Sequence, residues 1–120
     1  MELSDERCVP CRDGAPTLTT RELEELLPSL DGWQVVDHHH LHKGWSFADF
    51  QSALDWINRA GAVCEAAGHH ADFSLGWGRA EADIYTHKVN GLTRADVVLA
   101  AKLDAIDTTP ASTAGDHAAG

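Results

Sequence analysis

The sequence predicts an α+β domain: a four-stranded antiparallel sheet with helices packed on one face, in the order α-β-β-α-β-β-α. Two observations support this. Stretches with apolar residues three and four positions apart, as in helices, are interleaved with stretches in which apolar and polar residues alternate, as in strands. The strand-like stretches come in adjacent pairs separated by turn residues, which favours antiparallel pairing.

Length and composition limit the class of protein. A chain of 120 residues is the size of one domain, and 43% hydrophobic with 23% charged residues is typical of soluble globular proteins. No apolar run approaches the roughly 20 residues that span a bilayer, and no signal peptide opens the chain. We therefore expect a cytoplasmic protein without a membrane partner. The formal net charge of −10 argues against direct nucleic-acid binding.

The predicted domain covers residues 18–106. Residues 1–17 mix charged residues, Pro and Gly without a period, which predicts a flexible leader. Residues 107–120 consist mainly of Thr, Ala, Ser, Gly and Asp, a composition that predicts a disordered tail.

The first helix begins after Thr19, whose side chain can cap it while Glu22 bonds back to the Thr19 amide. Its apolar stripe is Leu23, Leu26, Leu27 and Leu30, and it ends at Asp31-Gly32 with Pro28 in its last turn. Residues 33–37 and 41–47 predict two strands joined by a turn near residues 38–40.

The second helix is predicted from an apolar stripe with helical spacing: Phe47, Phe50, Leu54, Ile57, Gly61, Cys64 and Gly68. Phe73, Leu75 and Trp77 then alternate in a third strand. The fourth strand has one small apolar face (Ala80, Ala82, Ile84, Thr86) and one polar face (Glu81, Asp83, Tyr85, His87). After a turn at Asn90-Gly91, Thr93 and Asp96 form a second capping box. Leu99, Leu103 and Ile106 line the last helix.

The cysteines and the His-rich run allow alternative interpretations. Cys64 lies on the apolar helix face, which favours an inert core thiol. Cys8 and Cys11 form a lone CxxC, either a reduced pair in the leader or part of a metal site. His38, His39, His40 and His42 are either exposed turn residues or metal ligands on a strand face. A metal binder that uses both groups predicts stoichiometric zinc in the purified protein.

The candidate site is a set of histidines and carboxylates between residues 65 and 96. Imidazole can both donate and accept a proton near neutral pH, so His69, His70 and His87 predict acid–base chemistry if the fold brings them together. Glu65 and His69 are four residues apart and meet on one helix face if the helix extends that far. A histidine at a helix C-terminus is stabilised in its protonated form, which biases His69 or His70 towards a proton donor.

These residues resemble the signature of the pterin-4a-carbinolamine dehydratase family. The similarity rests on Glu65-x3-His69-His70, an aromatic at Trp77, Thr86-His87 and Gly91-Leu92-Thr93-x2-Asp96. It extends from about residue 19 to residue 106. Periodicity gives only a compatible order of elements.

The resemblance implies a small α+β fold that forms a homodimer or a dimer of dimers. It implies dehydration of 4a-hydroxytetrahydropterin to quinonoid dihydropterin, a step in pterin recycling, with no metal or other cofactor. His69 and His87 would be the acid–base pair, and His70 would hold the pterin ring. Glu65 and Asp96 would orient or charge-balance the histidines. Trp77 and the backbone around Ala71 and Thr86 to Val89 would line the substrate.

The chain departs from that signature at three positions. Ala71 stands where the family usually has Pro, which would fix the backbone after the histidine pair. Asn90-Gly91 replaces the commoner Gly-Gly, and Trp77 the commoner Tyr. Ala71 supports an alternative function, a weak or inactive dehydratase-like binding protein of the coactivator or Rubisco/carboxysome assembly-factor type. Such a protein would have a protein partner.

Overall fold

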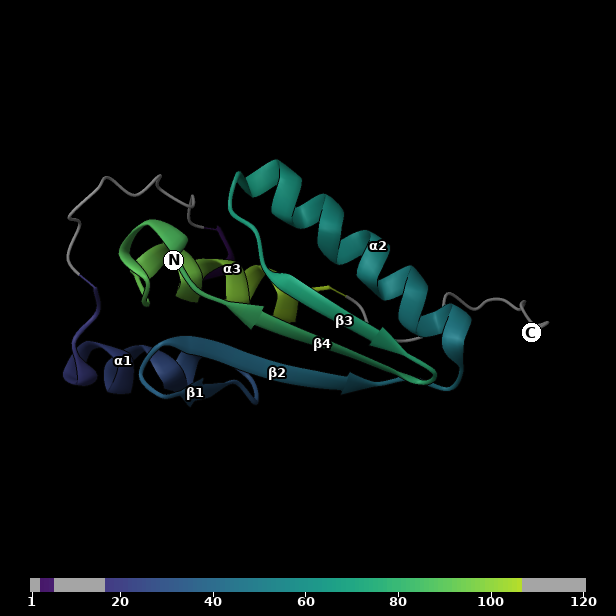
Figure 1. Ribbon diagram of the computed structural model, residues 1–120, viewed down its shortest axis with the longest axis horizontal. Helices are drawn as coiled ribbons and strands as arrows, with labels where there is room; N and C mark the ends of the chain where they lie inside the picture. Colours follow the sequence, from purple (N-terminus) through teal and green to yellow (C-terminus); the bar gives the residue numbers. More distant parts are fainter. Residues whose placement is uncertain (1–2, 6–16, 107–120) are drawn as a thin grey trace.

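The computed structural model describes residues 3–5 and 17–106 and confirms the predicted fold class (Figure 1). Most of the predicted leader, including Cys8 and Cys11, and the predicted tail from residue 107 lie outside the described residues. The elements are η1 (Leu3–Asp5), α1 (Thr20–Leu26), η2 (Leu27–Ser29), β1 (Gln34–Val36), β2 (His40–Ser46), α2 (Phe50–Ala67), β3 (Asp72–Gly76), β4 (Arg79–Ile84), η3 (His87–Val89) and α3 (Arg94–Asp104).

The four strands form one antiparallel sheet in the order β1-β2-β4-β3. Strand β4 is central, and its alternation sets the two faces of the sheet. Ala80, Ala82 and Ile84 are fully buried, whereas Glu81 and Asp83 between them are partly exposed. The residues just after β4 continue this alternation, with Thr86 buried and His87 exposed.

Helix α1 begins as predicted and ends earlier. The capping box of Thr19 and Glu22 is present, with the Glu22 N–H bonded to the Thr19 hydroxyl at 3.1 Å. The α-helix stops at Leu26, and η2 continues as a 3-10 turn with Pro28 in its first positions. Proline has no N–H for the α-helical ladder, so the chain tightens there.

Helix α2 packs on the sheet with a face rotated from the predicted one: Cys64 is buried and Ile57 packs against the core as expected, but the other predicted positions are not buried. Its N-cap is Asp49, so Phe47 precedes it, and Phe50 is 43% exposed. The buried positions are Ala53, Trp56, Ala60 and Cys64. The prediction was wrong because it gave every apolar residue equal weight. Burying the Trp56 ring removes a large apolar area from water, and small alanines on either side allow the helix to approach the sheet closely.

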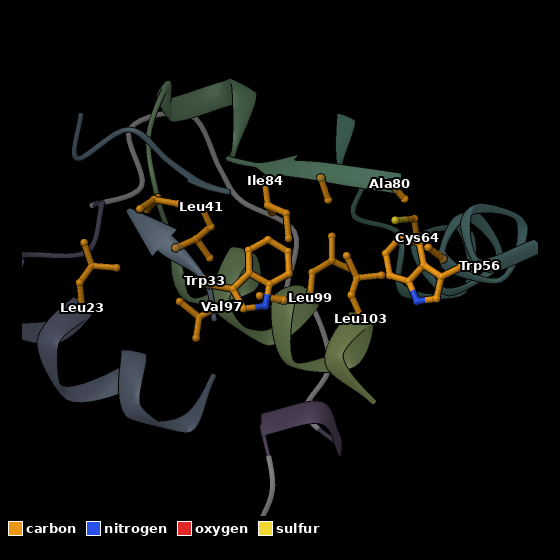
Figure 2. Close-up of a cluster of buried hydrophobic side chains, with 14 residues drawn as sticks. Leu23, Trp33, Leu41, Trp56, Cys64, Ala80, Ile84, Val97, Leu99 and Leu103 are labelled. Atoms are coloured by element: carbon orange, nitrogen blue, oxygen red, sulfur yellow. The ribbon is translucent and has the colours of Figure 1, made fainter. Parts of the chain in front are cut away.

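The core lies between the sheet and the helices (Figure 2). Helix α3 is buried nearly all round, with every residue from Ala95 to Ala101 and Leu103 buried. A helix apolar on all sides needs cover on all sides. Part of that cover is η1, which packs against α3 and accepts a hydrogen bond from Lys102 Nζ to the Ser4 carbonyl at 2.9 Å. The sequence pattern did not predict this contact.

Strand β3 ends at Gly76, so Trp77 lies in the β3–β4 turn and not in the strand as predicted. Gly78 in this turn has φ +71°, a left-handed conformation that favours glycine. Among the helices of the described part of the chain, none combines the length and the apolar character needed to cross a bilayer.

Candidate active site

The end of α2 places the first two histidines. Gly68 has φ 70° and ψ 22°, and its N–H bonds to the Cys64 carbonyl at 2.9 Å, a left-handed helix C-cap. This cap reverses the chain direction, so His69 and His70 lie in the connection between α2 and β3 rather than on the helix. His69 is partly buried and His70 is exposed.

Asp96 in the first turn of α3 holds His69. The His69 Nε2–H donates to Asp96 Oδ1 at 2.6 Å, and the carboxylate is fully buried. Its second oxygen accepts from the Thr93 N–H at 2.8 Å and from the Thr86 hydroxyl at 2.7 Å. The predicted Thr93–Asp96 capping box is therefore present. One helix-capping carboxylate also orients an imidazole, as the aspartate of a catalytic triad does.

The same carboxylate fixes the segment that carries His87. Thr86 is buried and bonded to Asp96, and its backbone N–H bonds to the Gly91 carbonyl at 2.8 Å. His87 follows directly in η3 and is exposed. Asn90 ends this turn with φ 51°, as the predicted Asn90-Gly91 turn requires. Asp96 thus ties together the two segments that supply His69 and His87.

The three histidines surround one open hollow of about 420 Å³ lined by Gly68, His69, His70, Asp72, Tyr85, Thr86, His87 and Lys88. A volume of 300–1,000 Å³ is usual for small-molecule sites. In Figure 1 the connection after α2 and the segment after β4 lie at the same end of the sheet. Antiparallel pairing of β3 with β4 explains this, because β3 begins where β4 ends.

Glu65 contacts a different histidine from the one expected. Its carboxylate pairs with His70 Nε2, and both side chains are largely exposed, 78% and 59%. The expected Glu65–His69 contact is wrong because α2 ends at Ala67 and the left-handed Gly68 turns His69 towards Asp96. Each residue of the His69-His70 pair therefore has its own carboxylate, one buried and one in solvent.

Two other predicted site residues lie outside the hollow. Ala71 is partly buried and packs against the core. Trp77 is 72% exposed in the β3–β4 turn, at the opposite end of the sheet from the histidines. Conversely, Gly68, Asp72 and Tyr85 line the hollow and were not named as site residues, whereas Lys88 lies within the predicted backbone range from Thr86 to Val89. The signal for Tyr85 was present, because the predicted alternation placed it on one polar face with His87. The predicted fourth strand was too long, since β4 ends at Ile84 and His87 lies in η3.

The His38–His42 run lies in and after the β1–β2 turn. His42 Nδ1 lies 2.7 Å from Asp83 Oδ1 on the neighbouring strand, and His39 Nε2 lies 2.9 Å from Asn90 Oδ1. Among the described residues no group of three or more histidine, cysteine or acidic side chains has a geometry that could hold a metal ion. The other half of the predicted metal site, Cys8 and Cys11, lies outside the described residues.

Comparison with known proteins gives a consistent family. The sequence model of "Pterin 4 alpha carbinolamine dehydratase" matches residues 16–106. A provisionally named pterin-4-alpha-carbinolamine dehydratase of Rubrobacter xylanophilus is 50% identical over 103 residues, which cover 86% of this chain and 96% of that protein. Its counterpart in Rickettsia canadensis is 42% identical over 103 residues, 85% of this chain and 94% of that protein.

Two solved structures are similar. The transcriptional coactivator/pterin dehydratase from Brucella melitensis has a TM-score of 0.70 and 33% identity, covering 75% of this chain and 97% of that one. A pterin dehydratase-like RuBisCO assembly factor of the alpha-carboxysome has a TM-score of 0.55 and 19% identity, covering 62% and 88%, and shares the fold. With the family match spanning the domain and the histidine-lined hollow, the chain belongs to the pterin 4 alpha carbinolamine dehydratase family.

Proposed function

We propose that this protein dehydrates 4a-hydroxytetrahydropterin to quinonoid dihydropterin by histidine acid–base catalysis. The observation that carries the proposal is the convergence of His69, His70 and His87 on one hollow. The buried Asp96 is bonded to His69 and, through Thr86, to the segment that carries His87. Family membership supports the reaction class.

The reaction needs one proton delivered and one removed. An imidazolium donates a proton to the 4a-hydroxyl oxygen, the C4a–O bond breaks, and water leaves. A neutral imidazole takes the proton from N5, and the N5–H electron pair forms the C4a=N5 double bond. We assign the two imidazoles to His69 and His87, because the hydrogen bond to the buried Asp96 orients the first and both line the same hollow. The two rings have exchanged protonation states after turnover, so a proton returned through solvent restores them.

His70 is proposed to hold the pterin ring. Its Nε2 is engaged by Glu65 at the exposed rim of the hollow, which leaves the ring as a wall for a flat heterocycle. Ala71 and the backbone from Thr86 to Val89 remain predicted substrate contacts. For Trp77, its distance along the sheet from the hollow makes a contact within the same chain inconsistent with this geometry.

Replacing the two catalytic histidines tests the function. We expect His69→Ala and His87→Ala each to lower kcat/KM for 4a-hydroxytetrahydropterin about 10²- to 10⁴-fold, the usual contribution of a positioned acid or base. Stopped-flow absorbance of the quinonoid product measures turnover, and circular dichroism checks the fold. The control is His38→Asn, since His38 does not line the hollow. Unchanged turnover in both alanine variants would refute the assigned roles.

The second candidate is a dehydratase-like binding protein. It is favoured by the likeness to the Brucella structure, which is described as both a coactivator and a dehydratase. A calorimetric titration with a dihydropterin separates the two. No binding, together with a stable protein complex recovered from cells, would support the second candidate. We further propose that the protein is cytoplasmic and forms a homodimer or a dimer of dimers. Size-exclusion chromatography with light scattering tests the oligomeric state.

A further inference from the structure

We propose that Tyr85 and His39 are positioning residues that hold the His87 imidazole in its reactive orientation. This inference rests on the proposed function, since it concerns how one of the three histidines is kept in place. His87 is exposed and lies in a three-residue 3-10 turn, a setting in which a side chain ordinarily samples several rotamers.

Tyr85 provides a flat surface for the His87 ring. The two ring centroids are 4.3 Å apart, and the planes differ by only 10°. Tyr85 comes directly after β4, is partly buried and packs against the core cluster, which fixes its ring. The same residue lines the hollow and supports the His87 ring.

His39 contacts the Tyr85 ring that supports His87. Its ring lies 4.4 Å from the Tyr85 ring with the planes 42° apart, so Tyr85 contacts an imidazole from each of two distant segments. His39 Nε2–H also donates to Asn90 Oδ1 at 2.9 Å. Asn90 closes the His87 turn, and its backbone N–H bonds to the His87 carbonyl at 3.2 Å. His39 thus contacts residues on both sides of His87.

The position of His39 is itself fixed by the β1–β2 turn. Its backbone N–H bonds to the Val36 carbonyl at 2.9 Å, and its Nδ1 lies 3.1 Å from His40 Nδ1. Because Asn90 Oδ1 can only accept, His39 carries its proton on Nε2, and in the neutral ring Nδ1 accepts from His40. The predicted turn histidines therefore contact the candidate active site through His39.

These contacts concern the orientation of a side chain rather than the stability of the segment. The backbone from Thr86 to Gly91 is already closed by hydrogen bonds between these two residues, and Thr86 is tied to Asp96. Removing the Tyr85 ring leaves those bonds in place and frees the His87 imidazole. Small losses of alignment between reacting groups cost large factors in rate.

The experiment compares Tyr85→Leu, Tyr85→Phe and His39→Ala in the full-length chain, with His38→Asn as the control. His38 has φ 54°, which asparagine tolerates, and it lies beside His39 in the same turn. Proton NMR of the His87 ring, assigned with His87→Gln, reports stacking directly, because a ring above the imidazole shifts its protons upfield. Steady-state kinetics give kcat and KM.

We expect Tyr85→Leu to abolish the upfield shift and to lower kcat about tenfold to a hundredfold with a smaller change in KM. Tyr85→Phe should restore both, and His39→Ala should give an intermediate loss. An unchanged His87 signal in Tyr85→Leu, or a lost shift with unchanged kcat, would overturn the proposal. A wild type without dehydratase activity refutes the proposed function instead, and the His87 shift then decides alone whether Tyr85 positions the ring.

Discussion

At the scale of single residues, Asp96 carries the most consequence. It is fully buried and accepts hydrogen bonds from His69, Thr86 and the Thr93 backbone. Replacing it by alanine leaves three donors without their acceptor. We expect Asp96→Ala to lower the free energy of unfolding by about 3–5 kcal/mol, the range for breaking a buried charged network. Urea unfolding followed by fluorescence measures this loss.

Glu65 supplies the matched control for that prediction. It also pairs with a histidine of the site, but its side chain is 78% exposed. Glu65→Ala should change the free energy of unfolding by less than about 0.5 kcal/mol, because solvent screens exposed pairs. Equal losses in the two variants would show that burial of Asp96 does not determine its contribution.

The backbone N–H of Ala71, which a proline at this position would lack, affects the pKa of the Cys64 thiol. Burial raises the pKa of the Cys64 thiol, a hydrogen bond from the Ala71 backbone lowers it by a smaller amount, and Glu65 raises it. Proline at position 71 would have no N–H for that bond.

The raised pKa predicts a pH dependence. Below the ordinary thiol pKa of about 8.5, Cys64 is neutral in both the folded and the unfolded chain, and its contribution to stability is fully present. Above that pH the unfolded chain ionises first, so the contribution is lost as the pH rises through the folded pKa. The stability difference between wild type and Cys64→Ala should shrink above about pH 8.5. Urea unfolding from pH 7 upwards tests this, and a constant difference would contradict it.

At the scale of elements, the caps of α2 fix where the helix begins and ends, and burial of one side chain fixes its rotation. The N-cap Asp49 bonds to the Ser52 N–H at 2.8 Å, and Gly68 provides the left-handed C-cap. Apolar spacing identified the helix, but its rotation depended on which apolar residue had the most to gain from burial. That residue is Trp56, which no periodicity distinguishes from its neighbours.

Two glycines in and after α2 should respond in opposite ways to alanine. Gly68 has φ +70°, so Gly68→Ala should destabilise the protein by about 1 kcal/mol and displace His69. Gly61 lies within the helix, and an added Cβ there meets nothing within 4 Å. Gly61→Ala should therefore stabilise by about 0.5–1 kcal/mol. Thermal unfolding of both variants measures the signs, and a stabilising Gly68→Ala would contradict the argument.

At the scale of the whole molecule, a partly buried ionic contact joins the sheet to the last helix. Lys43 of β2 donates to Asp104 Oδ1 at 2.7 Å, with the two side chains only 12% and 15% exposed. The Trp33 indole N–H donates to the same oxygen at 2.9 Å, and the Asp31 N–H to the other at 3.1 Å. This contact fixes α3, and hence Asp96, relative to the sheet that carries Thr86.

Replacing Asp104 and replacing Lys43 should lower the free energy of unfolding by different amounts. Asp104→Ala removes the acceptor of three donors, two of them partly buried, and should cost about 3 kcal/mol. Lys43→Met keeps an apolar chain against Trp45 and leaves Asp104 two donors, so it should cost only about 1–2 kcal/mol. Chemical denaturation compares them. Arg21→Ala, which removes an exposed pair with Glu25, is the control with an expected change below about 0.5 kcal/mol.

The order of the elements, the two capping boxes, the alternation along β4 and the three candidate histidines could all be predicted from the amino-acid sequence alone. These depend on local chemistry: residue spacing, turn formers and side chains that bond to nearby amides. The same local information misplaced Trp77, because alternation does not show where a strand gives way to its turn.

Which side chains come into contact is a property of the folded chain and could not be predicted from the sequence pattern. A left-handed glycine directs His69 to Asp96 rather than Glu65, and the β1–β2 turn brings His39 against Tyr85, far away in the chain. The rotation of α2 and the cover of α3 by η1 were decided there too. The physical reason is that such contacts depend on the area removed from water and on the path of the backbone between elements, neither of which is a property of local spacing.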